Sequence, residues 1–206
     1  MPSTMTILDI ANRAAVKLGE KQITSLTEDS KFARAMNNIV EPVRDRFLRE
    51  NDWNSATVRA TLAVSTTIPA WGYAHQFALP SDFLKMLEVR NPTATTATFN
   101  SYTNTPRNTE YRIEGDYIMA NEASTLQIRY VKRLTDASRY DSMMGEALAT
   151  LFAFEASYSI TSDKELRAEL KREYKDQILM AGRADGFDDP MEQFPEDDWV
   201  VARHEV

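Results

Sequence analysis

The spacing of apolar residues divides the chain into helical, alternating and again helical stretches. Near the N-terminus, Thr6 is expected to cap a first helix that ends at Gly19, and the polar cluster 27–30 opens a second helix. Apolar residues keep the helical period through both stretches: Ile7, Ile10, Ala11, Ala14 and Leu18, then Phe32, Ala33, Met36, Ile39, Val40, Val43 and Phe47. Because Pro42 removes one backbone hydrogen bond, we expect a kink there, or two shorter helices that meet near Glu41.

Past Trp53 the period changes from helical to alternating. Every second residue from Val58 to Val64 is apolar, which predicts a half-buried strand. Gly115 and Asp116 predict a tight hairpin between two later strands. Further strands are expected at His75–Leu79, Leu84–Arg90, Glu110–Glu114, Tyr117–Ala120 and Leu126–Val131.

The stretch 141–186 predicts a helical hairpin. Only two charged residues occur in 142–161, so its first helix should be buried on most sides. Small residues recur at helical spacing in that helix and let another backbone approach closely: Gly145, Ala149 and Ala153. Ser162 followed by Glu165 predicts a capping box for the next helix, and Gly186 is suited to a left-handed cap at its end.

These elements together predict an α+β fold. Two N-terminal helices (1–56) and two C-terminal helices (136–186) are expected to form a four-helix bundle, with an antiparallel β-rich insertion at 57–135. Within the insertion, 91–109 is rich in Thr, Asn, Ser and Pro and predicts a long loop or β-arm.

The last segment, 187–206, is expected to be an extended acidic tail. Six acidic residues lie between Asp188 and Asp198, and two prolines there disfavour a helix. The tail nevertheless finishes with an apolar group and a nearby arginine: Trp199, Val200, Val201 and Arg203. An apolar anchor at the end of an acidic tether indicates a docking partner.

Composition limits the classes of function. The 206 residues carry a net charge of −7, which argues against tight binding of a phosphate backbone. The sequence contains no cysteine, so disulfides, thiolate metal sites and cysteine nucleophiles are excluded. No apolar run reaches the length of a membrane span, and Met1 to Leu18 does not resemble a signal peptide, so we expect a soluble, intracellular protein.

Catalytic motifs are missing from the sequence. It has no phosphate-binding glycine loop, dinucleotide fingerprint or metalloprotease helix. The best carboxylate pair, Glu114 and Asp116, flanks a glycine as hairpin turns commonly do. His75 and His204 have no partner that the sequence identifies. We therefore predict no enzyme activity, no catalytic or metal-binding residue and no cofactor.

A series of short motifs extends from Arg44 to Asp185. A helix ends at a Trp-Asn-x-Ala corner, and an aromatic run leads into Leu-Pro-x-Asp. The residues concerned are Arg44, Asp45, Leu48, Arg49, Trp53, Asn54 and Ala56; Trp71, Tyr73, Phe77, Leu79, Pro80, Ser81, Asp82 and Leu84; Tyr111, Ile113, Glu114, Gly115 and Ile118; Leu126, Arg129, Tyr130, Val131, Thr135 and Asp136; and Ala147, Leu148, Ala149, Leu151, Ala153, Ala156, Ile160, Thr161, Tyr174, Ala181 and Asp185. In this order the motifs resemble the head-to-tail adaptor family of short-tailed bacteriophages, called tail tubular protein A. Pro42 and the pair His75 and Gln76 depart from the family pattern.

The resemblance implies a structural protein of the virion tail, assembled in the host cytoplasm. Such an adaptor forms a homo-oligomeric, dodecameric ring between the portal protein and the tail nozzle protein. Genomic DNA passes through its lumen without tight binding, and no membrane is involved. With this resemblance, we expect the portal contact on the tail (Trp199, Val200, Val201 and Arg203) and the nozzle contact on the loop 91–109 (Phe99, Tyr102 and Arg107). The small-residue stripe is compatible with subunit packing in a ring: Gly145, Ala149 and Ala153.

Two alternatives remain open from sequence. Some phage tail proteins are cell-wall hydrolases of the muramidase type, and carboxylates are plentiful here. The chain could also be an interaction module that forms no ring. Loss of turbidity of bacterial cell walls would identify a hydrolase, and size measurement with portal protein would separate the adaptor from the module.

Overall fold

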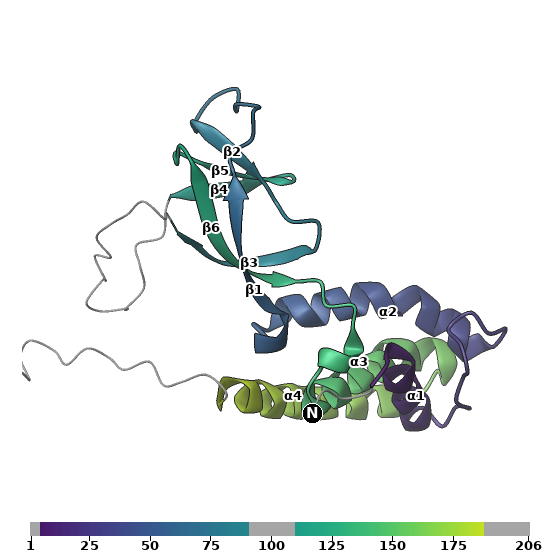
Figure 1. Cartoon of the computed structure of the whole chain (residues 1–206). Coiled ribbons are helices and arrows are strands. Elements are labelled where there is room, and N and C mark those ends of the chain that lie inside the picture. Colours follow the sequence, from purple (N-terminus) through teal and green to yellow (C-terminus); the bar gives the residue numbers. More distant parts are fainter. Residues whose placement is uncertain (1–4, 91–109, 188–206) are drawn as a thin grey trace, which may run out of the picture. The chain divides into compact units, whose positions relative to one another are not determined.

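A computed structural model describes residues 5–90 and 110–187 (Figure 1). In this part of the chain the fold is mixed α+β, with four α-helices and two small antiparallel sheets, as the α+β prediction required. The residues separate into a helical unit, built from both ends of the described chain, and a β unit, Val58–Tyr130. The elements are α1 (Ile7–Lys17), α2 (Lys31–Glu50), β1 (Thr57–Ala63), β2 (His75–Ala78), β3 (Phe83–Arg90), β4 (Tyr111–Glu114), β5 (Tyr117–Ala120), β6 (Thr125–Lys132), α3 (Ser142–Ile160) and α4 (Lys164–Phe187).

Local hydrogen bonds fix the ends of α1. The Thr6 hydroxyl accepts from the backbone N–H of Asp9 at 3.2 Å, and the Asp9 carboxylate accepts from the Thr6 N–H at 2.8 Å. This capping box satisfies amides that the helix leaves without partners. Gly19 has a φ of +70° just past the helix, and its N–H donates to Val16 O. Both predicted ends of this helix are therefore confirmed.

Helix α2 begins after Ser30, whose Oγ accepts from the Ala33 N–H at 3.1 Å. Pro42 lies inside one continuous helix, so the prediction of two shorter helices meeting near Glu41 is wrong. The physical reason is burial on both sides of the proline. Apolar side chains before and after it are buried in the same unit and hold both halves of the helix in place: Phe32, Met36, Val40, Val43 and Phe47.

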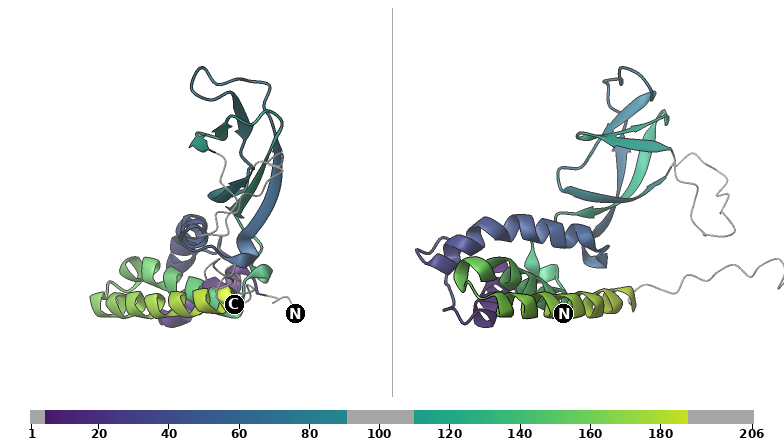
Figure 2. Two further views of the ribbon diagram at one scale, coloured as in Figure 1. Left: turned by 90° about the vertical axis from the view of Figure 1, so that its left-hand side faces the viewer. Right: turned by 180° about the vertical axis from the view of Figure 1, so that it is seen from behind.

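Helix α3 is buried on most sides and contacts α1, α2 and α4. It runs beside α4, to which a short turn connects it (Figure 2). The predicted capping box at Ser162 is wrong, because Ser162 adopts a left-handed φ of 56° in the turn. Asp163 caps α4 instead, and its Oδ1 accepts from the N–H groups of Glu165 at 2.8 Å and Leu166 at 3.2 Å. The N-cap of α4 is therefore Asp163, one residue after the predicted Ser162.

The predicted left-handed cap at Gly186 is also wrong, because α4 continues to Phe187. Near this end, the side-chain amide of Asn54 donates to the backbone oxygen of Asp185 at 2.8 Å. The Asn54 N–H donates to the Asp185 carboxylate at 3.0 Å. These bonds connect the last turns of α4 to the corner that follows α2. Within residues 5–90 and 110–187, no helix is both long and apolar enough to cross a membrane.

The β unit consists of two three-stranded sheets, in the orders β1-β6-β3 and β2-β5-β4. The predicted hairpin is confirmed: Glu114 pairs with Tyr117, and Gly115 in the turn between them has a φ of +57°. The sheets share one core. Its buried members come from both of them: Phe77, Val89, Ile118, Ala120, Leu126, Ile128 and Tyr130. The apolar residues of β1 pack against this core, as their alternation predicted.

Candidate functional site

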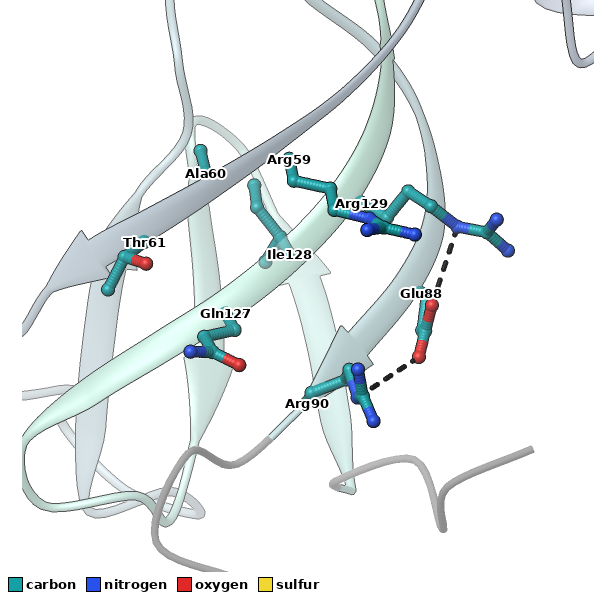
Figure 3. A pocket seen from close by; sticks show the side chains of 8 residues that line it. All are labelled: Arg59, Ala60, Thr61, Glu88, Arg90, Gln127, Ile128 and Arg129. Atoms are coloured by element: carbon teal, nitrogen blue, oxygen red, sulfur yellow. Dashed lines mark ion pairs between the residues drawn. The ribbon is translucent and has the colours of Figure 1, made fainter. Parts of the chain in front are cut away.

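Three arginines gather on one side of the β1-β6-β3 sheet, around an open depression of about 340 Å³ (Figure 3). Arg59 comes from β1, Arg90 from β3 and Arg129 from β6. Arg90 follows the buried Val89, and Arg129 lies between buried residues of β6, so the strand alternation turns the arginines away from the core. We call this surface the arginine face; its polar members are Arg59, Thr61, Glu88, Arg90, Gln127 and Arg129.

One carboxylate forms ion pairs with two of these arginines. Glu88, with a side chain only 15% exposed, lies 3.4 Å from Arg90 Nε through Oε1 and 3.4 Å from Arg129 Nε through Oε2. Both distances exceed those of short charge-assisted hydrogen bonds. The buried Nε of Arg129 makes no hydrogen bond in the described residues, although it is ion-paired. No ion pair of Arg59 is found in the same part of the chain, so the face carries three positive charges against one negative charge.

A second exposed feature of the β unit is the loop that joins β1 to β2. In this Trp71 loop, residues 65–74, Trp71 is 86% exposed and Ile68 is 70% exposed, and no residue is charged. Hydrogen bonds hold both ends of the loop. The Ser65 N–H donates to Gln76 O at 2.8 Å, and the Ala74 N–H donates to Asn121 Oδ1 at 3.0 Å. The loop therefore presents apolar side chains to solvent on an anchored backbone.

The helical unit has a depression of about 550 Å³ beside α1, but its charged groups already have partners. Lys17 Nζ lies 2.6 Å from Glu173 and 3.0 Å from Glu146, and Arg13 lies 3.3 Å from Glu146. Burial alone would lower the pKa of Lys17, but the hydrogen bonds to Glu173 and Glu146 outweigh burial and raise it. These ion pairs connect α1 to α3 and α4, which is a structural role.

Two buried tyrosines also have structural partners. The Tyr130 hydroxyl donates to Asp82 Oδ1 at 2.9 Å, and the Tyr140 hydroxyl donates to Leu134 O at 2.7 Å. Burial, with the hydrogen bond to Asp82, raises the pKa of Tyr130 to about 12. Burial raises the pKa of Tyr140 to about 12 as well. Both hydroxyls therefore stay protonated at neutral pH and act as hydrogen-bond donors.

Most of the predicted contact residues belong to parts of the chain that the structure does not describe. The proposed nozzle contacts and portal contacts lie outside the described residues: Phe99, Tyr102 and Arg107, and Trp199, Val200, Val201 and Arg203. The small-residue stripe is described, and it is buried inside the helical unit: Gly145, Ala149 and Ala153. Met5 covers Gly145 so closely that an added Cβ would lie 2.5 Å from its Cε. Packing of a second subunit on this stripe stays a prediction.

The carboxylates considered for hydrolysis are exposed on the β4-β5 hairpin. Glu114 ends β4, where Arg112 lies 3.9 Å away, and Asp116 lies in the turn. His75 begins β2. Among the residues with described positions, no group of three or more His, Cys, Asp or Glu could hold a metal ion.

Sequence reasoning missed the arginine face and the exposure of Trp71. The alternation within each strand shows its polar positions, but it does not show that β1, β6 and β3 lie side by side in one sheet.

Comparison of the sequence with protein-family models gave no match, and comparison with curated proteins gave none either.

Proposed function

We propose that the chain is a head-to-tail adaptor subunit of a short-tailed phage virion, which forms a ring between the portal and the tail nozzle. DNA passes through the ring during ejection. In this proposal the four helices pack as one bundle that carries the inserted β unit. The protein acts through contacts and not through catalysis.

The observation that carries the proposal is the exposure of Trp71. Trp71 and Phe77 belong to the same aromatic motif of the family resemblance, but the fold uses them differently. Phe77 is fully buried in the core of the β unit, whereas Trp71 is 86% exposed. Trp71 therefore adds little to the core of the β unit. Tryptophan is one of the residue types that are enriched among the dominant residues of protein interfaces. The position of Trp71 on an anchored, uncharged loop supports a contact with another protein of an assembly.

Other motif residues support a structural role for the motifs themselves. Asp45 accepts from Arg44 at 2.9 Å and from Arg133 at 2.8 Å, and Arg44 is buried. Asp82 accepts from Tyr130, and Asn54 binds Asp185. Arg44 and Asp45 are neighbours in sequence, but the other three pairs are far apart in sequence and each meets within one unit. Residues of the resemblance therefore stabilise the fold, as expected of a scaffold protein.

Binding of the wild-type chain to the nozzle and portal proteins of the same virion tests this function. We assign the Trp71 loop to the nozzle contact, because the resemblance implies a subunit whose β-rich end faces the tail. Trp71→Ala should weaken nozzle binding about tenfold or more in sedimentation or calorimetry. Tyr158→Ala is the matched control, because Tyr158 is a 57% exposed aromatic residue on α3, and this variant should bind normally.

The same preparation separates the alternatives. A chain that binds neither portal nor nozzle is not an adaptor. A chain that binds portal but forms no ring is an interaction module. A chain that clears a suspension of bacterial cell walls is a hydrolase, and Glu114→Gln would then identify whether the hairpin carboxylate takes part.

A further inference from the structure

We propose that the arginine face binds the acidic segment Asp188–Asp198 of its own chain. This inference does not depend on the adaptor function, because it concerns two parts of one molecule. The arginine face is described by the structure, and the acidic segment lies outside the described residues and is known from its sequence.

The first argument is the charge imbalance on the arginine face. Arg59, Arg90 and Arg129 supply three positive charges and Glu88 one negative charge, which leaves +2 on a single sheet face. Each guanidinium carries five N–H donors, whereas Glu88 offers two oxygens, which lie 3.4 Å from the Nε atoms of Arg90 and Arg129. The remaining donors point to a ligand with several carboxylates, because Arg and carboxylate match in a two-bond geometry.

The second argument is where the negative charge of the chain lies. Segment 188–198 contains six acidic residues and no Lys or Arg, which gives it a charge of −6. The whole chain carries −7, so the remaining residues together carry −1 (−7 minus −6). No other part of the chain offers so dense a run of carboxylates. The segment also belongs to the same chain, so every arginine face comes with one such acidic segment.

A nucleic-acid backbone fits the arginine face less well. The exposed Trp71 lies in the loop between β1 and β2 and does not line this depression, so the interleaving of aromatic and basic groups typical of single-strand binding is missing from its lining. We therefore assign the arginine face to carboxylates.

Cross-linking of the full-length chain tests the assignment. Arg59→Lys places a primary amine on the arginine face, and a carbodiimide then couples that amine to a carboxylate in direct contact. Mass spectrometry should find the link between position 59 and a peptide that contains residues 188–198. Arg112→Lys is the control, because Arg112 is 67% exposed on β4, outside the face, and should form no such link.

Mixing isotopically labelled and unlabelled protein shows whether the link forms within one chain or between two. Links within one chain, lost when the salt concentration rises from about 50 to about 500 mM, are the expected result. A link found only between two copies would overturn the own-chain assignment. No link to 188–198, from protein whose circular dichroism matches the wild type, would overturn it as well.

A second measurement examines the competing ligand. The full-length chain is titrated with a DNA duplex, and we expect weak binding that Arg59→Glu changes less than twofold. Tight DNA binding that Arg59→Glu reduces tenfold or more would assign the arginine face to phosphate and overturn the proposal.

Discussion

Trp53 stacks on Phe47 with ring centroids 5.1 Å apart, and its indole N–H donates to the Phe47 backbone oxygen at 3.3 Å. Phe47 is fully buried and Trp53 is 2% exposed. The contact turns the chain back against the last turns of α2 before the short 3-10 helix Asn54–Ala56 leads into β1. The Trp-Asn-x-Ala motif therefore forms a packed corner of the helical unit.

Removing the indole should weaken this corner strongly. Trp53→Ala is expected to lower the free energy of unfolding by about 3 to 5 kcal/mol, because it leaves a large cavity against Phe47. Trp53→Phe keeps most of the ring contact and should cost less. Urea unfolding followed by circular dichroism measures both variants. A loss below about 1 kcal/mol for Trp53→Ala would mean that the corner adds little to stability.

The small-residue stripe of α3 gives a second prediction. Ala149 is fully buried, so Ala149→Leu should overpack the helical unit and lower its stability by about 1 to 3 kcal/mol. Ala168→Leu is the matched control, since Ala168 is exposed on α4 and the same substitution there should have little effect. Thermal unfolding of the two variants tests whether Ala149→Leu is the more destabilising substitution. Equal melting temperatures would contradict the prediction that the site of Ala149 is too tightly packed for a leucine.

Much of the fold follows from local sequence. The alternation from Val58 to Val64 identified β1, and Thr6 identified the start of α1, because each signal acts over a few residues. The sequence around the start of α4 does not identify the cap, because Ser162 and Asp163 are both good capping residues. Only the left-handed backbone of Ser162, set by the turn after α3, decides between them.

The candidate surfaces were harder to predict because they depend on contacts distant in sequence. Arg59 and Arg129 are separated by almost the whole β unit, and only the placement of β6 between β1 and β3 brings them together. Trp71 and Phe77 look alike as aromatic residues of one motif. The strand β2 includes Phe77 and not Trp71, and this boundary decides which ring is buried.

The buried tyrosines predict a loss of stability at high pH. The pKa of Tyr130 and that of Tyr140 are raised from 10.0 to about 12, so the folded protein holds these protons more tightly than the unfolded chain. Their contribution to stability is complete below about pH 10 and is lost as the pH rises to about 12. Urea unfolding at several pH values should show this fall.

The double variant Tyr130→Phe and Tyr140→Phe checks the cause. Without the two hydroxyls, the fall in stability between pH 10 and pH 12 should become smaller than in the wild type. An identical pH dependence in the double variant would assign the effect to other groups.

The tail gives a prediction about binding. Trp199 lies outside the described residues, and we expect it to anchor the chain on the portal protein. Trp199→Ala should weaken portal binding by about 2 kcal/mol or more, because a buried tryptophan commonly dominates an interface. Arg203→Ala should have a smaller effect. Calorimetric titration of portal protein measures both variants, and unchanged affinity of Trp199→Ala would move the portal contact to another part of the chain.

The adaptor function itself is tested most directly by electron microscopy of the purified chain mixed with the portal protein of the same virion. We predict a ring of this chain, with about twelve copies, seated coaxially on the portal ring. Portal rings that remain bare, in a mixture where circular dichroism shows the chain to be folded, would contradict the proposed function.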